Sequence, residues 1–77
     1  MAISAYVFIE ACPGKAQEAR NGITRISGVK EAHLVTGPYD IVVLVEAPDI
    51  KSLGTLVISQ IQAVGGVNKT LTSVVAE

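Results

Sequence analysis

A faint internal repeat constrains the fold of this chain more than any other feature of its sequence. A shift of 38 positions lays residues 26–29 on residues 64–67. The same shift aligns three further apolar pairs: Ala19 with Val57, Ile23 with Ile61, and Val7 with Val45. Each copy has the pattern of a strand, a helix and a second strand. Two copies predict the order βαββαβ, which is that of the ferredoxin-like split βαβ sandwich.

The element boundaries follow from apolar periodicity and from turn residues. Strands are expected at residues 4–11, 29–36, 39–47 and 67–76, and helices at 15–26 and 50–64. Asp49 is expected to cap the second helix. Apolar residues line one face of each helix: Ala16, Ala19, Ile23 and Ile26 in the first, and Ile50, Leu53, Val57, Ile61 and Val64 in the second.

The expected class is therefore α+β. Right-handed crossovers place both helices on one face of a four-stranded antiparallel sheet, with the first and third strands at its centre. The continuous apolar run of residues 41–45 also predicts a central strand that is covered on both faces.

Two helices leave the second face of this sheet bare. Five apolar residues of the central strands cannot all lie under the helices: Tyr6, Phe8, Ile41, Val43 and Val45. A large exposed apolar patch marks an interface. A 77-residue chain also buries only about 60% of its surface, and a single cysteine makes no internal disulfide. We therefore expect a homodimer packed sheet to sheet, a dimeric α/β barrel with twofold symmetry.

Composition excludes several functional classes. Six basic residues face seven acidic ones without forming a block, which argues against direct nucleic-acid binding. No uninterrupted apolar stretch is long enough to span a membrane, and the N-terminus lacks the pattern of a signal peptide. A single domain over residues 1–77 with one reduced thiol, located in the cytoplasm, is the expectation.

Catalytic and cofactor motifs are missing from the sequence. His33 lies mid-strand without an acidic or thiol neighbour, and Cys12 is interpreted as a packed thiol. The sequence has no glycine-rich phosphate loop, no spacing of metal ligands and no nucleophile elbow. We therefore expect no catalytic residue, no cofactor and no metal.

Two polar segments are candidates for ligand binding. In residues 36–40 (Thr-Gly-Pro-Tyr-Asp), Asp40 opens the most apolar strand, although aspartate is disfavoured in strands. Its carboxylate could meet a ligand ammonium beside Tyr39, or it could only bond N–H groups of the turn. Thr70 and Thr72 could bind a small carboxylate, or they could be ordinary exposed strand residues. An uncharged stripe on the second helix suits a subunit contact: Ser52, Thr55, Ser59 and Gln62.

Taken in order, these residues resemble the effector-binding domain of Lrp/AsnC-type transcription regulators, the RAM domain. The matching pieces are Pro13-Gly14, Gly28-Val29, the hairpin of residues 36–40, Pro48-Asp49, and Gly66-Val67 with the two threonines of the last strand. The resemblance implies a ferredoxin-like fold that dimerises through its sheets, and dimers that assemble into rings, often octamers. It also implies a free amino acid bound between dimers, lined by Gly37, Tyr39 and Asp40 and reached by Thr70 and Thr72.

Full regulators of this family carry a helix-turn-helix ahead of this domain, whereas here Met1 leads directly into the first strand. The expectation is a stand-alone, non-enzymatic amino-acid-sensing and oligomerisation module in transcriptional or metabolic regulation. It could co-assemble with a full-length Lrp/AsnC-type regulator. Three alternatives stay open: a pure assembly scaffold, a small dimeric α/β-barrel enzyme resembling cofactor-free monooxygenases, and an ACT-type sensor.

Overall fold

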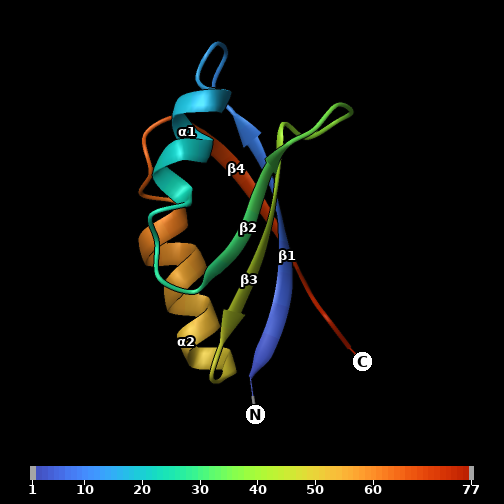
Figure 1. Cartoon of the computed structure of the whole chain (residues 1–77), viewed down its shortest axis with the longest axis vertical. Helices are drawn as coiled ribbons and strands as arrows, with labels where there is room; N and C mark the ends of the chain where they lie inside the picture. Colours follow the sequence, from blue (N-terminus) through green and yellow to red (C-terminus); the bar gives the residue numbers. More distant parts are fainter. Residues whose placement is uncertain (1, 77) are drawn as a thin grey trace.

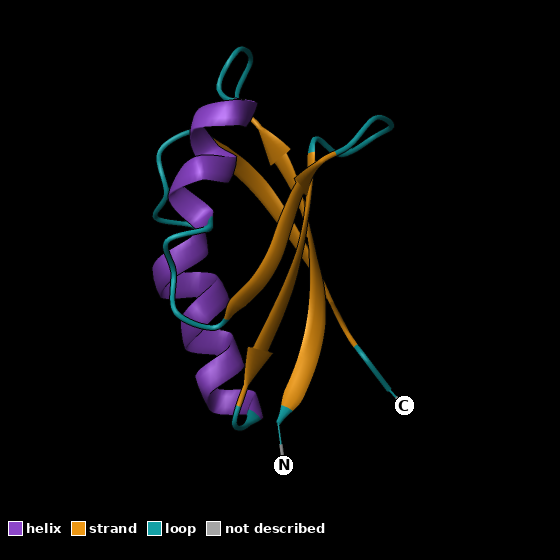
Figure 2. Ribbon diagram, viewed as in Figure 1, coloured by secondary structure: helices purple, strands orange, loops and turns teal. Residues whose placement is uncertain are grey.

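The four strands form one antiparallel sheet, and the helices cover one of its faces (Figures 1 and 2). A computed structural model describes residues 2–76; Met1 and Glu77 lie outside them. The elements are β1 (Ile3–Ala11), α1 (Ala16–Ile23), β2 (Val29–Leu34), β3 (Ile41–Ala47), α2 (Ile50–Thr55), its continuation η1 (Leu56–Ile61) and β4 (Val67–Val74). The sheet order β2-β3-β1-β4 confirms the ferredoxin-like α+β fold and the central pair of strands.

The elements are shorter than the sequence patterns predict. Strand β2 stops at Leu34 and β3 starts at Ile41, so residues 35–40 form the connection. Tyr39 and Asp40, expected in the strand, precede it. Helix α1 ends at Ile23 rather than at residue 26, and β4 ends at Val74 rather than at residue 76.

The buried core lies between the sheet and the helices. Alternate residues of the two central strands face it: Ala5, Val7 and Ile9 in β1, and Ile41, Val43 and Val45 in β3. The residues between them in sequence lie on the other face. Val42 and Leu44 are there only half-buried, so a single copy covers β3 fully on its helix side alone, and cover of its second face by another copy stays a prediction.

The bare face of the sheet, here called the open face, is apolar at its centre. Cross-strand pairing aligns Tyr6 with Leu44 and with Ser73, and Phe8 with Val42 and with Leu71. Tyr6 is 44% exposed and Leu71 is 50% exposed. Charged side chains border this patch on the β2 side, where the Lys30 Nζ lies 3.6 Å from the Glu46 Oε1.

The second helix departs from the continuous α-helix expected at residues 50–64. Residues Leu56–Ile61 form a π-helix, and the Gln62 N–H donates to the Val57 carbonyl five residues earlier at 3.0 Å. Leu53, Val57 and Ile61 are buried as predicted, whereas Ile50 is 60% exposed and its predicted burial is wrong. One-turn π segments of this kind are frequent at functional sites.

Asp49 caps α2 as expected. Its Oδ1 accepts a hydrogen bond from the Ser52 N–H at 2.7 Å. This bond stabilises the ionised carboxylate and lowers the pKa of Asp49 below its usual value.

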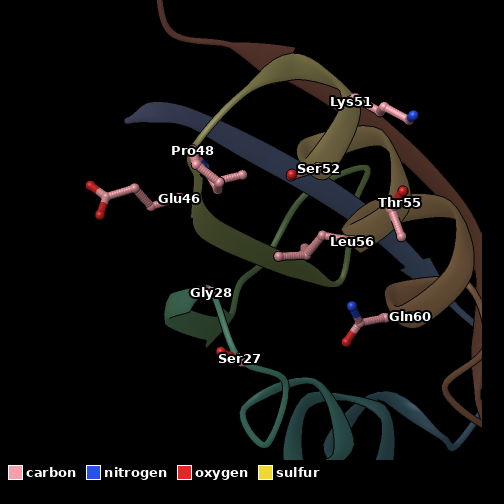
Figure 3. A pocket seen from close by; sticks show the side chains of 10 residues that line it. Ser27, Gly28, Glu46, Pro48, Lys51, Ser52, Thr55, Leu56 and Gln60 are labelled. Carbon is pink, nitrogen blue, oxygen red and sulfur yellow. The ribbon is translucent and has the colours of Figure 1, made fainter. Parts of the chain in front are cut away.

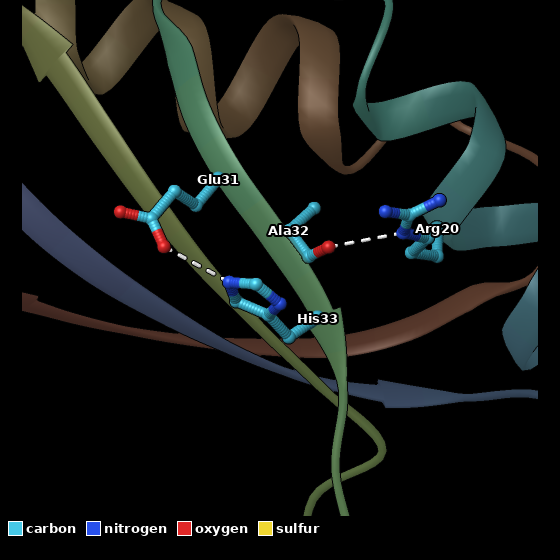
Figure 4. A network of polar contacts seen from close by, with 4 residues as sticks. All are labelled: Arg20, Glu31, Ala32 and His33. Carbon is cyan, nitrogen blue, oxygen red and sulfur yellow. Dashed lines mark hydrogen bonds and ion pairs between the residues drawn. The ribbon is translucent and has the colours of Figure 1, made fainter.

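Two polar contacts involve strand β2 (Figure 4). The Arg20 Nε donates to the Ala32 carbonyl at 2.9 Å, which ties α1 to the strand. On the open face, His33 Nε2 lies 2.9 Å from Glu31 Oε1. The interpretation that His33 lacks an acidic neighbour is therefore wrong, because alternate residues of a strand share a face.

Two glycines one repeat apart are required at the starts of β2 and β4. Gly28 and Gly66 have φ of +99° and +96°, in the left-handed region. A Cβ on Gly66 would lie 2.9 Å from the Lys15 Cβ and 3.1 Å from the Lys15 carbonyl oxygen. Backbone conformation and close packing therefore require glycine at this position in both halves of the repeat, at Gly28 and at Gly66.

We expect Gly66→Ala to lower the free energy of unfolding by about 2 kcal/mol or more. The left-handed conformation alone costs a non-glycine residue roughly 1–2 kcal/mol, and the clash with Lys15 adds to it. Gly14→Ala is the matched control, because Gly14 has φ of +76° but a Cβ there meets no atom within 4 Å. Thermal denaturation would measure the loss in both variants. Equal losses of the free energy of unfolding in Gly66→Ala and Gly14→Ala would contradict this account.

The two ends of the sheet differ. At one end β1 begins and β4 ends, and the Val75 N–H donates to the Ser4 carbonyl at 2.8 Å. At the other end lies the β2–β3 connection, so the described termini and this hairpin point in opposite directions along the long axis (Figure 1). Among residues 2–76, no helix is long and apolar enough to cross a membrane.

Candidate functional site

The hairpin of residues 35–40 is joined to β1 through Asp40. The Asp40 Oδ2 accepts the Ala11 N–H at 2.8 Å, and the Asp40 N–H donates to the Ile9 carbonyl at 2.9 Å. The bond to Ala11 lies where a register shift interrupts the pairing of β1 with β4. The sequence leaves two alternatives open for the Asp40 carboxylate, a ligand ammonium or N–H groups of the turn. In the structure it accepts a backbone N–H, but the donor is Ala11 of strand β1 rather than a residue of the turn.

Tyr39 extends the open face toward the hairpin. Its ring lies 5.6 Å from that of Phe8, between centroids, at an interplanar angle of 46°. The two rings share a hollow of about 250 Å³ with Val35, Thr36, Pro38 and Val42. Gly37 lies in the hairpin with φ of +122°. Gly37, Tyr39 and Asp40 therefore form one local group.

Thr70 and Thr72 lie at the opposite edge of the sheet, on β4. Their register partners on β1 are Ile9 and Val7, both buried on the helix side. The threonines consequently face the second helix rather than the open face. The Gln62 Nε2 donates to the Thr70 Oγ1 at 2.8 Å, which links the end of η1 to the strand.

A groove of about 360 Å³ runs between β4 and the second helix, and we call it the β4 groove. Leu53 and Val57 are buried beneath it, and Ile58 on its rim is 65% exposed. Its polar end is at the Gln62–Thr70 hydrogen bond and its apolar end at Ile50 and Val74. The remaining lining residues are Gly54 and Thr72, so none of the described residues that line the groove is charged.

Within one copy, the five residues predicted for the ligand site fall into two groups. The hairpin group lies beside β3, and the threonine group lies on β4 with β1 between them. Tyr39 lies beside Phe8 on the open face, whereas the two threonines face the second helix, so the two groups lie on opposite faces of the sheet.

A second hollow, of about 400 Å³, lies between the α1–β2 loop, the end of β3 and the second helix (Figure 3). Ser52 and Thr55 line it, whereas Gln62 belongs to the β4 groove. The predicted uncharged stripe is therefore divided between two surfaces. Glu46 and Lys51 are the charged residues of this hollow (Figure 3).

The sequence patterns missed Gly54, Val57 and Ile58 as groove residues. A periodicity analysis assigns apolar helix residues to the core and does not show which strand lies beside them. The one feature of the sequence that could have indicated the groove is Gly54, because glycine is unusual inside a helix. Within residues 2–76 no group of three or more His, Cys, Asp or Glu is arranged to hold a metal ion.

Comparison with known protein families and sequences identifies the relatives of this chain. The family model of the Lrp/AsnC ligand binding domain matches residues 4–77. An uncharacterized HTH-type transcriptional regulator of Pyrococcus horikoshii is 34% identical over 74 residues, which cover 92% of this chain and 49% of that protein. The chain thus spans about half the length of such curated relatives. A homocitrate synthase of Sulfurisphaera tokodaii is 52% identical over 50 residues, 65% of this chain and 11% of the synthase.

Solved structures share the fold. TTHA0845 from Thermus thermophilus superposes with a TM-score of 0.92 at 33% identity, over 97% of this chain and 94% of that chain. The feast or famine regulatory protein of M. tuberculosis, solved in complex with L-methionine, has a TM-score of 0.84 at 24% identity. That match covers 97% of this chain and 50% of that chain. The matching family model and these relatives confirm the resemblance seen in the sequence: the chain belongs to the family of Lrp/AsnC ligand binding domains.

Proposed function

We propose that this protein senses a free amino acid and that it does so as an oligomer. The observation that carries the proposal is the β4 groove, an uncharged hollow of about 360 Å³ with hydroxyl and amide groups at one end. Small-molecule sites are concave and mostly apolar, with a few polar groups that fix orientation. The M. tuberculosis relative complexed with L-methionine supports this class of effector.

The proposed assembly has two kinds of contact. The open face packs against that of a second copy, which buries the patch around Tyr6, Phe8 and Leu71 and forms a dimeric α/β barrel. Four such dimers then associate into an octamer, so that the hairpin of one copy approaches the β4 groove of another.

Such an approach gives the effector a complete set of polar partners. The Thr70 and Thr72 hydroxyls would bind its carboxylate, and Asp40 of the neighbouring copy would attract its ammonium beside Tyr39 and Gly37. Opposite charges attract each other more strongly where water is excluded, because the effective dielectric constant is lower there. The effector would then stabilise the assembled form through its differential affinity for it.

The context of the relatives supports a regulatory role in the cell. This domain matches part of transcription regulators and a small part of a homocitrate synthase. We infer that the module acts in the cytoplasm in transcriptional or metabolic regulation, without catalytic activity of its own. It could act alone or together with a full-length Lrp/AsnC-type regulator.

The main test is a thermal-shift screen against the twenty amino acids, with the mass of the assembly measured in parallel. A ligand at about 100 times its Kd adds about 2.7 kcal/mol of stability, which raises the Tm of a domain of this size by several degrees. A selective shift supports the sensor. A uniformly flat response from an intact oligomer would instead support a scaffold, and turnover of an activated aromatic substrate would support an enzyme.

For the amino acid that shifts the Tm, we expect Thr72→Val to weaken binding about 10- to 100-fold. The substitution keeps the shape of the side chain but removes a hydroxyl, and a hydrogen bond to a charged group contributes about 1.5–3 kcal/mol. Thr55→Val is the matched control, because Thr55 lies on α2 outside the β4 groove. Equal affinities of the two variants in calorimetric titration would exclude Thr72 from the site.

A further inference from the structure

Gly54 is a glycine that the fold itself does not require. It lies inside α2, where glycine stabilises a helix less than alanine does. The glycines with positive φ are Gly14, Gly28, Gly37 and Gly66, and Gly54 is not among them. A Cβ built on Gly54 meets no heavy atom within 4 Å. Neither backbone conformation nor close packing explains its presence.

The space beside Gly54 is part of the β4 groove. A side chain at this position would extend into the groove, above the buried side chains of Leu53 and Val57. Gly54 therefore leaves open a volume that any larger residue would fill, and it does so at the expense of helix stability. This is the pattern expected where a ligand, rather than the protein, occupies the space.

The chemistry of the groove indicates which ligand fits. The second helix runs antiparallel to β4, so Gln62 and Thr70 meet at one end while Ile50 and Val74 lie toward the other. Because the Thr70 oxygen accepts the Gln62 N–H, the Thr70 hydroxyl keeps its own proton to donate. That end, with the Thr72 hydroxyl next along the same face of β4, suits a carboxylate, whereas the rest of the groove offers only apolar groups.

From these features we propose that Gly54 determines the specificity of the site for an amino acid with an uncharged, aliphatic side chain. The side chain of the effector lies in the groove over Gly54, and its carboxylate lies at the Gln62–Thr70 end. This inference rests on the proposed function, since it names the class of effector and the residue that selects it. A charged side chain is disfavoured because its desolvation would not be compensated by any lining residue.

The test compares Gly54→Ala and Gly54→Leu with the unaltered protein. Calorimetric titrations would use leucine, isoleucine, methionine, valine and alanine, with aspartate and lysine as charged ligands. We expect both variants to have a Tm at least equal to that of the unaltered protein. We expect Gly54→Ala to weaken binding of the largest accepted side chain about tenfold more than that of alanine, since one methylene changes discrimination by roughly 10- to 200-fold. Gly54→Leu should lose binding by at least 100-fold.

Gln17→Leu is the control, because Gln17 is exposed on α1 and lines neither the groove nor the uncharged stripe of the second helix. Unchanged affinity in Gly54→Leu, with the unaltered protein binding an amino acid, would overturn the role of Gly54 while leaving the proposed function intact. Preferred binding of aspartate or lysine would overturn the aliphatic class. A change of assembly mass in Gly54→Leu with unchanged affinity would assign the groove to another copy of the chain. Absence of binding to every amino acid would overturn both proposals.

Discussion

Leu71→Asp is expected to convert the proposed oligomer into monomers. Leu71 lies on the open face, next to Phe8 in the cross-strand register, and it is half exposed in the single copy. In a sheet-to-sheet dimer this position is buried, and an unpaired buried carboxylate costs several kcal/mol. The dimer dissociation constant should therefore rise at least 100-fold. Sedimentation velocity at micromolar concentration would measure the change.

Gln17→Asp is the control for Leu71→Asp. It adds the same charge on the helix side of the molecule, where Gln17 is exposed on α1 and lies outside both the open face and the uncharged stripe of the second helix. Its mass should equal that of the unaltered protein. An unaltered protein that is itself monomeric, or a Leu71→Asp variant of unchanged mass, would refute packing through the open face.

The second large effect is expected from Ile9→Ala. Ile9 is fully buried in central strand β1, between Ile41 on β3 and Thr70 on β4. An Ile→Ala substitution in a core costs about 2–5 kcal/mol, and a core of this size supplies only about 3–5 kcal/mol. The isolated variant subunit should therefore be largely unfolded at room temperature. Urea titration followed by circular dichroism would measure the loss.

Ile50→Ala is the matched control for this prediction. It makes the same chemical change at a residue that is mostly exposed, where substitutions usually change stability by about 0.5 kcal/mol or less. Equal losses in the two variants would contradict the assignment of the core to the space between the sheet and the helices. The comparison also tests the corrected placement of Ile50.

The order of the elements could be predicted because it is encoded by local signals. The repeat of Gly28 and Gly66 marks the start of a strand in each half, and both glycines prove necessary for backbone conformation and packing. Alternation in β1 separates Val7 and Ile9 from Tyr6 and Phe8. Such signals depend on near neighbours in sequence, which is why they predict strands and helices well.

The details of the candidate site depend on contacts that are distant in sequence. The continuous apolar run in β3 does not reveal which residues face the helices. The π turn that leads to Gln62 has no signature in the apolar periodicity, and Ile50 matches the periodicity yet lies at the exposed start of α2. The separation of Asp40 from Thr70 follows only from the sheet order, with β1 between them.

The hydrogen bond between Val75 and Ser4 brings the two described termini together at the end of the sheet away from the hairpin. Any segment fused to either terminus would begin on that side. Such a segment would be remote from Asp40 and could respond to an effector through the relative orientation of neighbouring subunits rather than by touching the ligand. This geometry suits a domain that can be fused to unrelated proteins at either terminus without a change in its own sheet.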